Sequence, residues 1–134
     1  MSRTRAALVL GASGSVGDAL INELVRHRSF SPIVTFVRRS QPEQVAIARA
    51  AKVELRETLV PAMNPTSLEI ATLGAIRAIE GDVVAFSLLG IGAGTAKLTI
   101  DQHRAVDVRL NVAFARGLQA SGRVKHLAFM SAAG

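Results

Sequence analysis

The chain has 134 residues, which predicts one domain. Because 49% of the residues are hydrophobic, we expect a sizeable core, and a disordered protein is excluded. No apolar run reaches the length of about 18 residues that a membrane span needs. The absence of cysteine excludes disulfides, thiolate metal sites and cysteine nucleophiles, and we expect a cytoplasmic protein. The net charge of +6 comes from scattered basic residues and the 5 aromatic residues are all Phe, mostly within apolar runs, so a nucleic acid is not expected as the main partner.

Short apolar runs alternate with amphipathic segments along the whole chain. In chain order, the pattern predicts strands at 5–10, 33–37, within 53–60, 83–89 and 124–130, and helices at 15–27, 42–51, 66–79 and 99–120. The segment 29–32 is expected to be a turn. The N-terminal residues lead directly into the first apolar run, so no signal peptide is expected.

Capping residues and prolines delimit the predicted helices. Pro42 occupies the first turn of the second helix, with Ser40 or Gln41 as the N-cap. Pro61 and Pro65 are expected to break the chain before a third helix that Thr66 or Ser67 caps. Thr99 and Gln102 have the spacing of a capping box for the fourth helix.

The alternation of strands and helices predicts an α/β fold. We expect a doubly wound, Rossmann-like parallel sheet of five strands in the order 3-2-1-4-5, formed by residues 1–134 as one NAD(P)-binding domain. The order reverses between the first and fourth strands. Ligands of such sheets bind at that switch point, beyond the carboxyl ends of the strands.

A glycine-rich segment, Gly11-Ala-Ser-Gly14-Ser-Val-Gly17, joins the first strand to the first helix. In a dinucleotide-binding loop, such glycines permit a sharp turn, close approach of the main chain to the pyrophosphate, and tight packing of the helix on the sheet. The helix N-terminus then offers N–H groups to the phosphates. The alternative is a tight turn without a ligand; a P-loop is excluded because no Gly-Lys-Ser/Thr follows. The predicted cofactor-binding residues are Gly11, Ser13, Gly14, Ser15, Val16 and Gly17.

The end of the second strand distinguishes between the two nicotinamide cofactors. An acidic residue there binds the ribose 2′-hydroxyl of NAD, whereas arginine accommodates the 2′-phosphate of NADP. The strand ends in Arg38-Arg39, and no acid follows until Glu43. Guanidinium groups can bind a phosphate through paired hydrogen bonds. We therefore predict NADP(H) rather than NAD(H), the alternative being two solvated arginines without a ligand.

Further motifs extend along the chain: the Phe30-Ser31 turn, Asp82-Val83 leading into Leu89-Gly90, Asn111-Val112, and the segment from Gly122 to Ser131. Together with the glycine loop and Arg38-Arg39, they resemble the atypical branch of the short-chain dehydrogenase/reductase superfamily, and within it the Tat-interacting oxidoreductase-like subgroup. This resemblance implies an oxidoreductase that transfers a hydride to or from a small-molecule substrate, which the sequence does not identify.

The resemblance also implies roles for single residues. Leu89 and Gly90 would line the adenine-ribose side of the cofactor, and Ser131 would be the catalytic Ser that polarises a substrate carbonyl; the alternative for Ser131 is a cap at a strand end. Relatives often pair through their fourth and fifth helices, and an exposed side of residues 106–118 would permit a homodimer.

The sequence departs from the family's pattern where the proton donor should be. The family's Tyr-x-x-x-Lys should follow the fifth strand, but the chain contains no Tyr. Reduction of a carbonyl needs such a donor for the developing alkoxide. We therefore expect a chain truncated before its catalytic and substrate-binding part, and one that is inactive alone.

Two alternatives remain. The chain could be a non-catalytic nucleotide sensor or scaffold, or the cofactor domain of a semialdehyde dehydrogenase, which shares the loop but requires a Cys nucleophile that is absent here. His27, His103 and His126 are far apart in sequence and form no metal-binding pair, so no metal site is expected.

Overall fold

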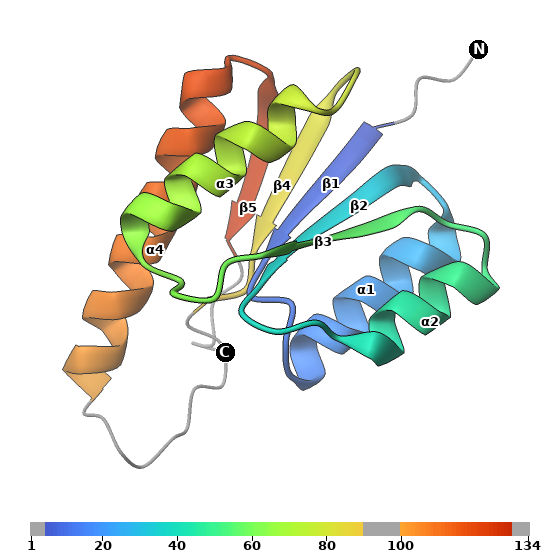
Figure 1. The fold of residues 1–134 in the computed structure, drawn as a ribbon, viewed down its shortest axis with the longest axis horizontal. Coiled ribbons are helices and arrows are strands. Elements are labelled where there is room, and N and C mark those ends of the chain that lie inside the picture. Colours follow the sequence, from blue (N-terminus) through green and yellow to red (C-terminus); the bar gives the residue numbers. More distant parts are fainter. Residues whose placement is uncertain (1–4, 90–99, 130–134) are drawn as a thin grey trace.

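The computed structural model describes residues 5–89 and 100–129. Strands and helices alternate strictly through these residues (Figure 1). The strands are β1 (Arg5–Leu10), β2 (Phe30–Val37), β3 (Leu55–Leu59), β4 (Val83–Ser87) and β5 (Val124–Phe129). The helices are α1 (Ser15–His27), α2 (Pro42–Ala50), α3 (Pro65–Arg77) and α4 (Ile100–Ser121).

The strands form a parallel sheet in the order β3-β2-β1-β4-β5. Helices α1 and α2 cover one face of the sheet, and α3 and α4 cover the other (Figure 1). The predicted Rossmann-like α/β fold with a parallel sheet is therefore confirmed, including the reversal of strand order between β1 and β4. β1, β2 and β4 end at the lower edge of the sheet in Figure 1, which places the residues directly after β1 and β2 near Leu88 and Leu89, which follow β4.

The core consists of two apolar clusters, one on each face of the sheet. Leu8 and Leu10 of β1 belong to the cluster under α3 and α4, whereas Ala7 and Val9 belong to the cluster under α1 and α2. All four are fully buried. β1 is thus covered on both faces, as its unbroken apolar sequence predicts for a parallel strand. The burial of each large apolar side chain stabilises the sheet by about 1.5–3 kcal/mol, so the switch point is built on a rigid support.

The second strand is longer than the sequence indicated. The segment expected to be a turn at 29–32 belongs largely to β2, which begins at Phe30. Arg5 pairs with Phe30, but Ala7 pairs with Ile33, so β2 has one extra residue between the two pairs. Such an irregularity tolerates Pro32, which has no N–H to donate to the sheet, so the strand includes residues at which a turn was expected.

The third helix begins earlier than expected. Asn64, and not Thr66 or Ser67, is its N-cap, and the Asn64 Oδ1 accepts a 2.8 Å hydrogen bond from the N–H of Ser67. Pro65 is the first helical residue instead of a break, because proline lacks only an N–H that would be unpaired at that position anyway. The second helix begins at Pro42 with Gln41 as N-cap, as predicted.

Two further differences lie near the switch point. β4 ends at Ser87, so Leu88 and Leu89 leave the strand before the position expected. The helix α4 begins at Ile100. The predicted capping box of this helix depends on Thr99, which lies outside the described residues. Within the described ranges, no helix is both long and apolar enough to cross a membrane.

Candidate functional site

A cavity of about 610 Å³ lies where β1, β2 and β4 end. Its volume is in the range of small-molecule sites, about 300–1,000 Å³. It is lined by the glycine loop, the β2–α2 turn, the β3–α3 loop, the end of β4 and α4. The lining residues are Leu10, Gly11, Ser13, Phe36, Val37, Arg38, Arg39, Gln41, Met63, Leu89, Asp107 and Leu110.

The glycine loop turns sharply away from β1 beside the end of β4. A Cβ on Gly11 would lie 3.2 Å from the backbone nitrogen of Leu89, so the two loops are in close contact. Gly14 has φ 93° and ψ 178°, a conformation that side chains rarely adopt, and a Cβ placed there would have no neighbour within 4 Å. The space beside Gly14 is therefore open, as close approach of a ligand to the main chain requires.

The N-terminus of α1 is free to bind an anion. Gly14 is its N-cap and makes no side-chain capping hydrogen bond. The N–H of Asp18 donates to the Gly14 carbonyl at 2.9 Å, which closes the first helical turn. The amides of the preceding first turn have no carbonyl within the helix to bond. Together with the helix dipole they create a site that favours negative charge. Ser13, Ser15 and Val16 are exposed there.

Gly17 is buried and packs against the loop that precedes it. A Cβ on Gly17 would lie 2.0 Å from the carbonyl oxygen of Ala12, so no other residue fits. The same Ala12 carbonyl accepts a 2.8 Å hydrogen bond from Nε2 of Gln44. Nε2 also donates to Oδ1 of Asp18 at 2.8 Å. Gln44 of α2 therefore connects both ends of the glycine loop. The only signal of this role in the sequence is that Gln44 is a polar residue on a helix that packs on the core.

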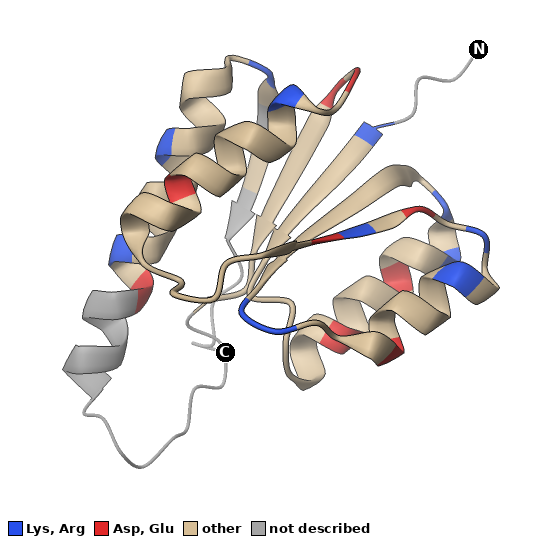
Figure 2. Cartoon of the chain, viewed as in Figure 1, with Lys and Arg blue, Asp and Glu red and all other residues tan. Residues whose placement is uncertain are grey.

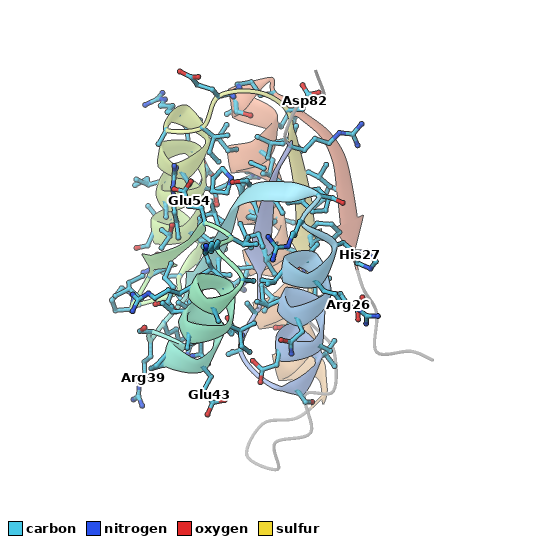
Figure 3. All side chains as sticks on the ribbon, turned by 90° about the vertical axis from the view of Figure 1, so that its right-hand side faces the viewer. Arg26, His27, Arg39, Glu43, Glu54 and Asp82 are labelled. Atoms are coloured by element: carbon cyan, nitrogen blue, oxygen red, sulfur yellow. The ribbon has the colours of Figure 1, made fainter. Side chains whose placement is uncertain are left out.

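The β2–α2 turn carries Arg38 and Arg39, both exposed. Figure 2 shows basic residues at the lower end of β2, and Figure 3 shows Arg39 and Glu43 extending from that end, far from Asp82. Among the described residues, no salt bridge joins either arginine to a carboxylate. Both guanidinium groups are therefore available to an anionic ligand in the cavity that they line.

Glu57 of β3 holds this turn in place. Its carboxylate accepts a 2.5 Å hydrogen bond from the Ser40 hydroxyl and a 2.6 Å hydrogen bond from the N–H of Gln41. The Gln41 side chain in turn donates to the Arg39 carbonyl at 3.1 Å. The Glu57 carboxylate is thus bonded to neutral donors, and no salt bridge among the described residues joins it to either arginine. Sequence reasoning missed Glu57 because strand pairing, and not sequence proximity, brings it to the turn.

The end of β4 is fixed from α4. The hydroxyl of Ser87 donates to Oδ1 of Asn111, and the N–H of Leu89 donates to the Ser87 oxygen at 3.4 Å. Leu89 lines the cavity. It follows β4, which lies on one side of β1, whereas the turn with the two arginines follows β2, which lies on the other side. Met63 and Asp107 also line the cavity, and sequence reasoning did not identify either.

The structure therefore brings several predicted residues to one cavity: Gly11, Ser13, Arg38, Arg39 and Leu89. Gly14, Ser15, Val16 and Gly17 lie in the adjoining loop and helix start. Gly90 and Ser131 lie outside the described residues. In the part of the chain that the structure describes, no three His, Asp or Glu side chains are grouped to hold a metal.

Several solved structures share this fold. A short-chain dehydrogenase/reductase from Serratia marcescens superposes with a TM-score of 0.65 at 19% identity, over 91% of this chain and 54% of that one. An actinorhodin polyketide ketoreductase with NADPH gives 0.64 at 18% identity, over 93% and 52%. The 3-oxoacyl-[acyl-carrier protein] reductase from Brucella melitensis, in complex with NAD, gives 0.65 at 15% identity, over 95% and 56%.

The present chain spans about half the length of these structures. No protein-family model matches it, and none of the curated proteins matches it in sequence. At identities below 20%, the similarity is one of fold. The chain has the Rossmann-like fold of the short-chain dehydrogenase/reductases.

Proposed function

We propose that this chain binds a nicotinamide dinucleotide, with NADP(H) preferred over NAD(H), as the cofactor domain of an oxidoreductase. One observation carries the proposal: Gly11 and Ser13 of the glycine loop line the same cavity as Arg38 and Arg39, which form no ion pair with any carboxylate that the structure describes. This is the position at which doubly wound sheets bind dinucleotides. The solved structures named above include one with NADPH and one with NAD.

The glycine loop and the start of α1 would hold the pyrophosphate. Gly14 leaves room for the phosphates to approach the main chain, and the first-turn amides of α1 lack a side-chain cap that would compete with them. The Ser13 and Ser15 hydroxyls, both on exposed residues, can add donors. All of these contacts are made to groups that NAD and NADP have in common.

Arg38 and Arg39 would bind the 2′-phosphate that only NADP carries. Their side chains are exposed, and the carboxylate of Glu57 is bonded to Ser40 and to the Gln41 amide instead. Two cations without a carboxylate partner attract a phosphate dianion more strongly than a neutral ribose hydroxyl. The preference for NADP(H) follows from this difference.

Hydride transfer is a proposal for a longer protein. The bound dinucleotide would exchange a hydride with a small-molecule substrate, and a side chain would have to move a proton to or from the substrate oxygen. The chain contains no Tyr to serve as that donor. The same observation favours a second candidate, a nucleotide sensor or scaffold that binds the cofactor without chemistry. A Tyr-x-x-x-Lys sequence downstream in the gene supports the enzyme, and its absence supports the sensor.

The direct test is a calorimetric titration of the purified chain with NADPH and with NADH at moderate ionic strength. We expect NADPH to bind at least about tenfold more tightly, because the additional charge-assisted hydrogen bonds contribute about 1.5–3 kcal/mol. Equal affinities would remove the role given to Arg38 and Arg39. Failure of both to bind would overturn the proposed function itself.

A further inference from the structure

We propose that Gln44 is a positioning residue that sets the orientation of the pyrophosphate-binding loop from the adjacent helix. The inference rests on the proposed function, because it assigns a role within the same site. Gln44 lies in the first turns of α2 and is 1% exposed. It is one of the few buried polar side chains among the described residues, and its position requires an explanation.

The stability of the fold does not explain why a glutamine occupies this buried position. Its Nε2 has two acceptors, but its Oε1 is buried and has no hydrogen-bond partner among the described residues. Exchanging the two amide atoms would not help, since the Ala12 carbonyl and the Asp18 carboxylate both accept hydrogen bonds. A buried carbonyl without a donor is destabilising. An apolar residue of similar size would avoid this penalty, so the benefit of Gln44 lies in what its Nε2 group holds.

The Ala12 carbonyl determines how the loop presents its next amide. A trans peptide places its C=O and its N–H on opposite sides. The Ala12 oxygen is held toward Gln44 on one side and packs on Gly17. The N–H of Ser13 is therefore turned away from α2, and Ser13 lines the cavity. Without the bond from Nε2, rotation of this peptide would change which groups the loop offers to a phosphate.

The same amide connects the two halves of the site. Nε2 bridges Ala12, before the loop's second glycine, and Asp18, in the first turn of α1. Gln44 itself follows the arginine turn closely, since α2 begins at Pro42. One side chain thus fixes the glycine loop, the start of α1 and the start of α2 relative to each other. Its loss should weaken the binding of both dinucleotides equally, because both share the pyrophosphate.

The test compares the wild-type chain with Gln44→Met, which has similar volume and no donor, and with Gln44→Asn, whose amide is one methylene too short. Ala48→Gly is the matched control, because Ala48 is buried on the same helix and its methyl side chain has no hydrogen-bonding group to offer the loop. NADPH and NADH affinities are measured at a temperature at which all four proteins are folded. We expect about tenfold weaker binding of both dinucleotides in the Gln44 variants, and unchanged binding in Ala48→Gly.

A second measurement needs no nucleotide. The amide resonance of Ser13 in a ¹⁵N–¹H spectrum should shift or broaden in both Gln44 variants and stay unchanged in Ala48→Gly. If the Gln44 variants bind like the wild type, or if Ala48→Gly weakens binding as much as they do, Gln44 is only structural and the inference is wrong. If the wild type binds neither dinucleotide, the proposed function fails, and an unchanged Ser13 resonance then overturns the inference independently.

Discussion

The β1–α1 loop and the β2–α2 turn border the same cavity, but they are built in opposite ways. The loop offers main-chain groups, and its shape is fixed by close packing: Gly17 leaves no room for a side chain beside the Ala12 carbonyl. The turn offers two long, exposed, charged side chains, Arg38 and Arg39, and only its backbone is held, through the bonds of Glu57 to Ser40 and Gln41. One region is closely packed and uncharged, and the other is exposed at its side chains and cationic.

This difference matches what the two regions would have to recognise. A pyrophosphate is common to both nicotinamide cofactors, so a rigid main-chain cradle suits it and provides affinity without discrimination. The 2′-phosphate distinguishes NADP from NAD by charge, so charged side chains provide the discrimination. Damage to the loop should therefore reduce the affinity for both cofactors, and damage to the turn should change their ratio. The variants below test this division.

The largest effect is expected from Gly17→Ala. The new Cβ would lie 2.0 Å from the Ala12 oxygen and 2.3 Å from its carbon, so the backbone of the loop must move. We expect a loss of about 3 kcal/mol in the free energy of unfolding and no detectable binding of either dinucleotide. Urea denaturation followed by circular dichroism measures the first, and calorimetry measures the second.

Gly74→Ala provides the matched control for this variant. Gly74 lies in α3, and a Cβ there would have no neighbour within 4 Å. Because alanine is the better helix former by about 1 kcal/mol, this change should stabilise the chain and leave binding unaltered. Tight binding by Gly17→Ala would show that the loop is not the cradle described above.

The next effect is expected from Arg38→Ala and Arg39→Ala. Each removes one cation from the wall of the cavity. We expect NADPH to bind about 10-fold to 100-fold more weakly in each variant, since a charge-assisted hydrogen bond contributes about 1.5–3 kcal/mol, with NADH affinity unchanged. Arg49→Ala, at the far end of α2, controls for net charge. An equal loss for NADPH and NADH would contradict the division between loop and turn.

The two regions also differ in how far they could be predicted. Sequence located the glycine loop because its conformation depends on local backbone requirements, which appear as fixed spacings of Gly11, Gly14 and Gly17. Sequence also placed Arg38 and Arg39 at a strand end, because β2 is recognisable from its β-branched residues. The parallel α/β sheet could be predicted because strands and helices alternate, and each is recognisable from its own local sequence pattern.

The residues that hold these regions in place were not predictable in this way. Gln44 and Glu57 reach the loop and the turn across 32 and 16 positions of the sequence, through helix packing and strand register. A single sequence contains no local signal for such pairs. The predicted starts of β2 and α3 were wrong for a related reason. The effect of Pro32 and Pro65 depends on which backbone N–H would otherwise be bonded, and that is known only from the fold.

The smallest effect on affinity is expected from Glu57→Gln. The amide oxygen can still accept from the Gln41 N–H, and the amide nitrogen can donate to the Ser40 oxygen, but both hydrogen bonds lose the charge of the carboxylate. We expect the free energy of unfolding to fall by about 1–2 kcal/mol. NADPH affinity should change by less than about threefold, because loosening of the turn weakens binding while loss of a nearby negative charge strengthens it.

Glu54→Gln provides the comparison for this last variant, since Glu54 pairs with Arg56 at 2.6 Å but both side chains are more than two-fifths exposed, at 49% and 43%. An exposed pair contributes at most about 1 kcal/mol. Denaturation curves of the two variants should therefore differ, with Glu57→Gln the less stable. Equal curves would mean that Glu57 supports the turn no better than a surface ion pair does, and the arginines would then owe their position to the end of β2 alone.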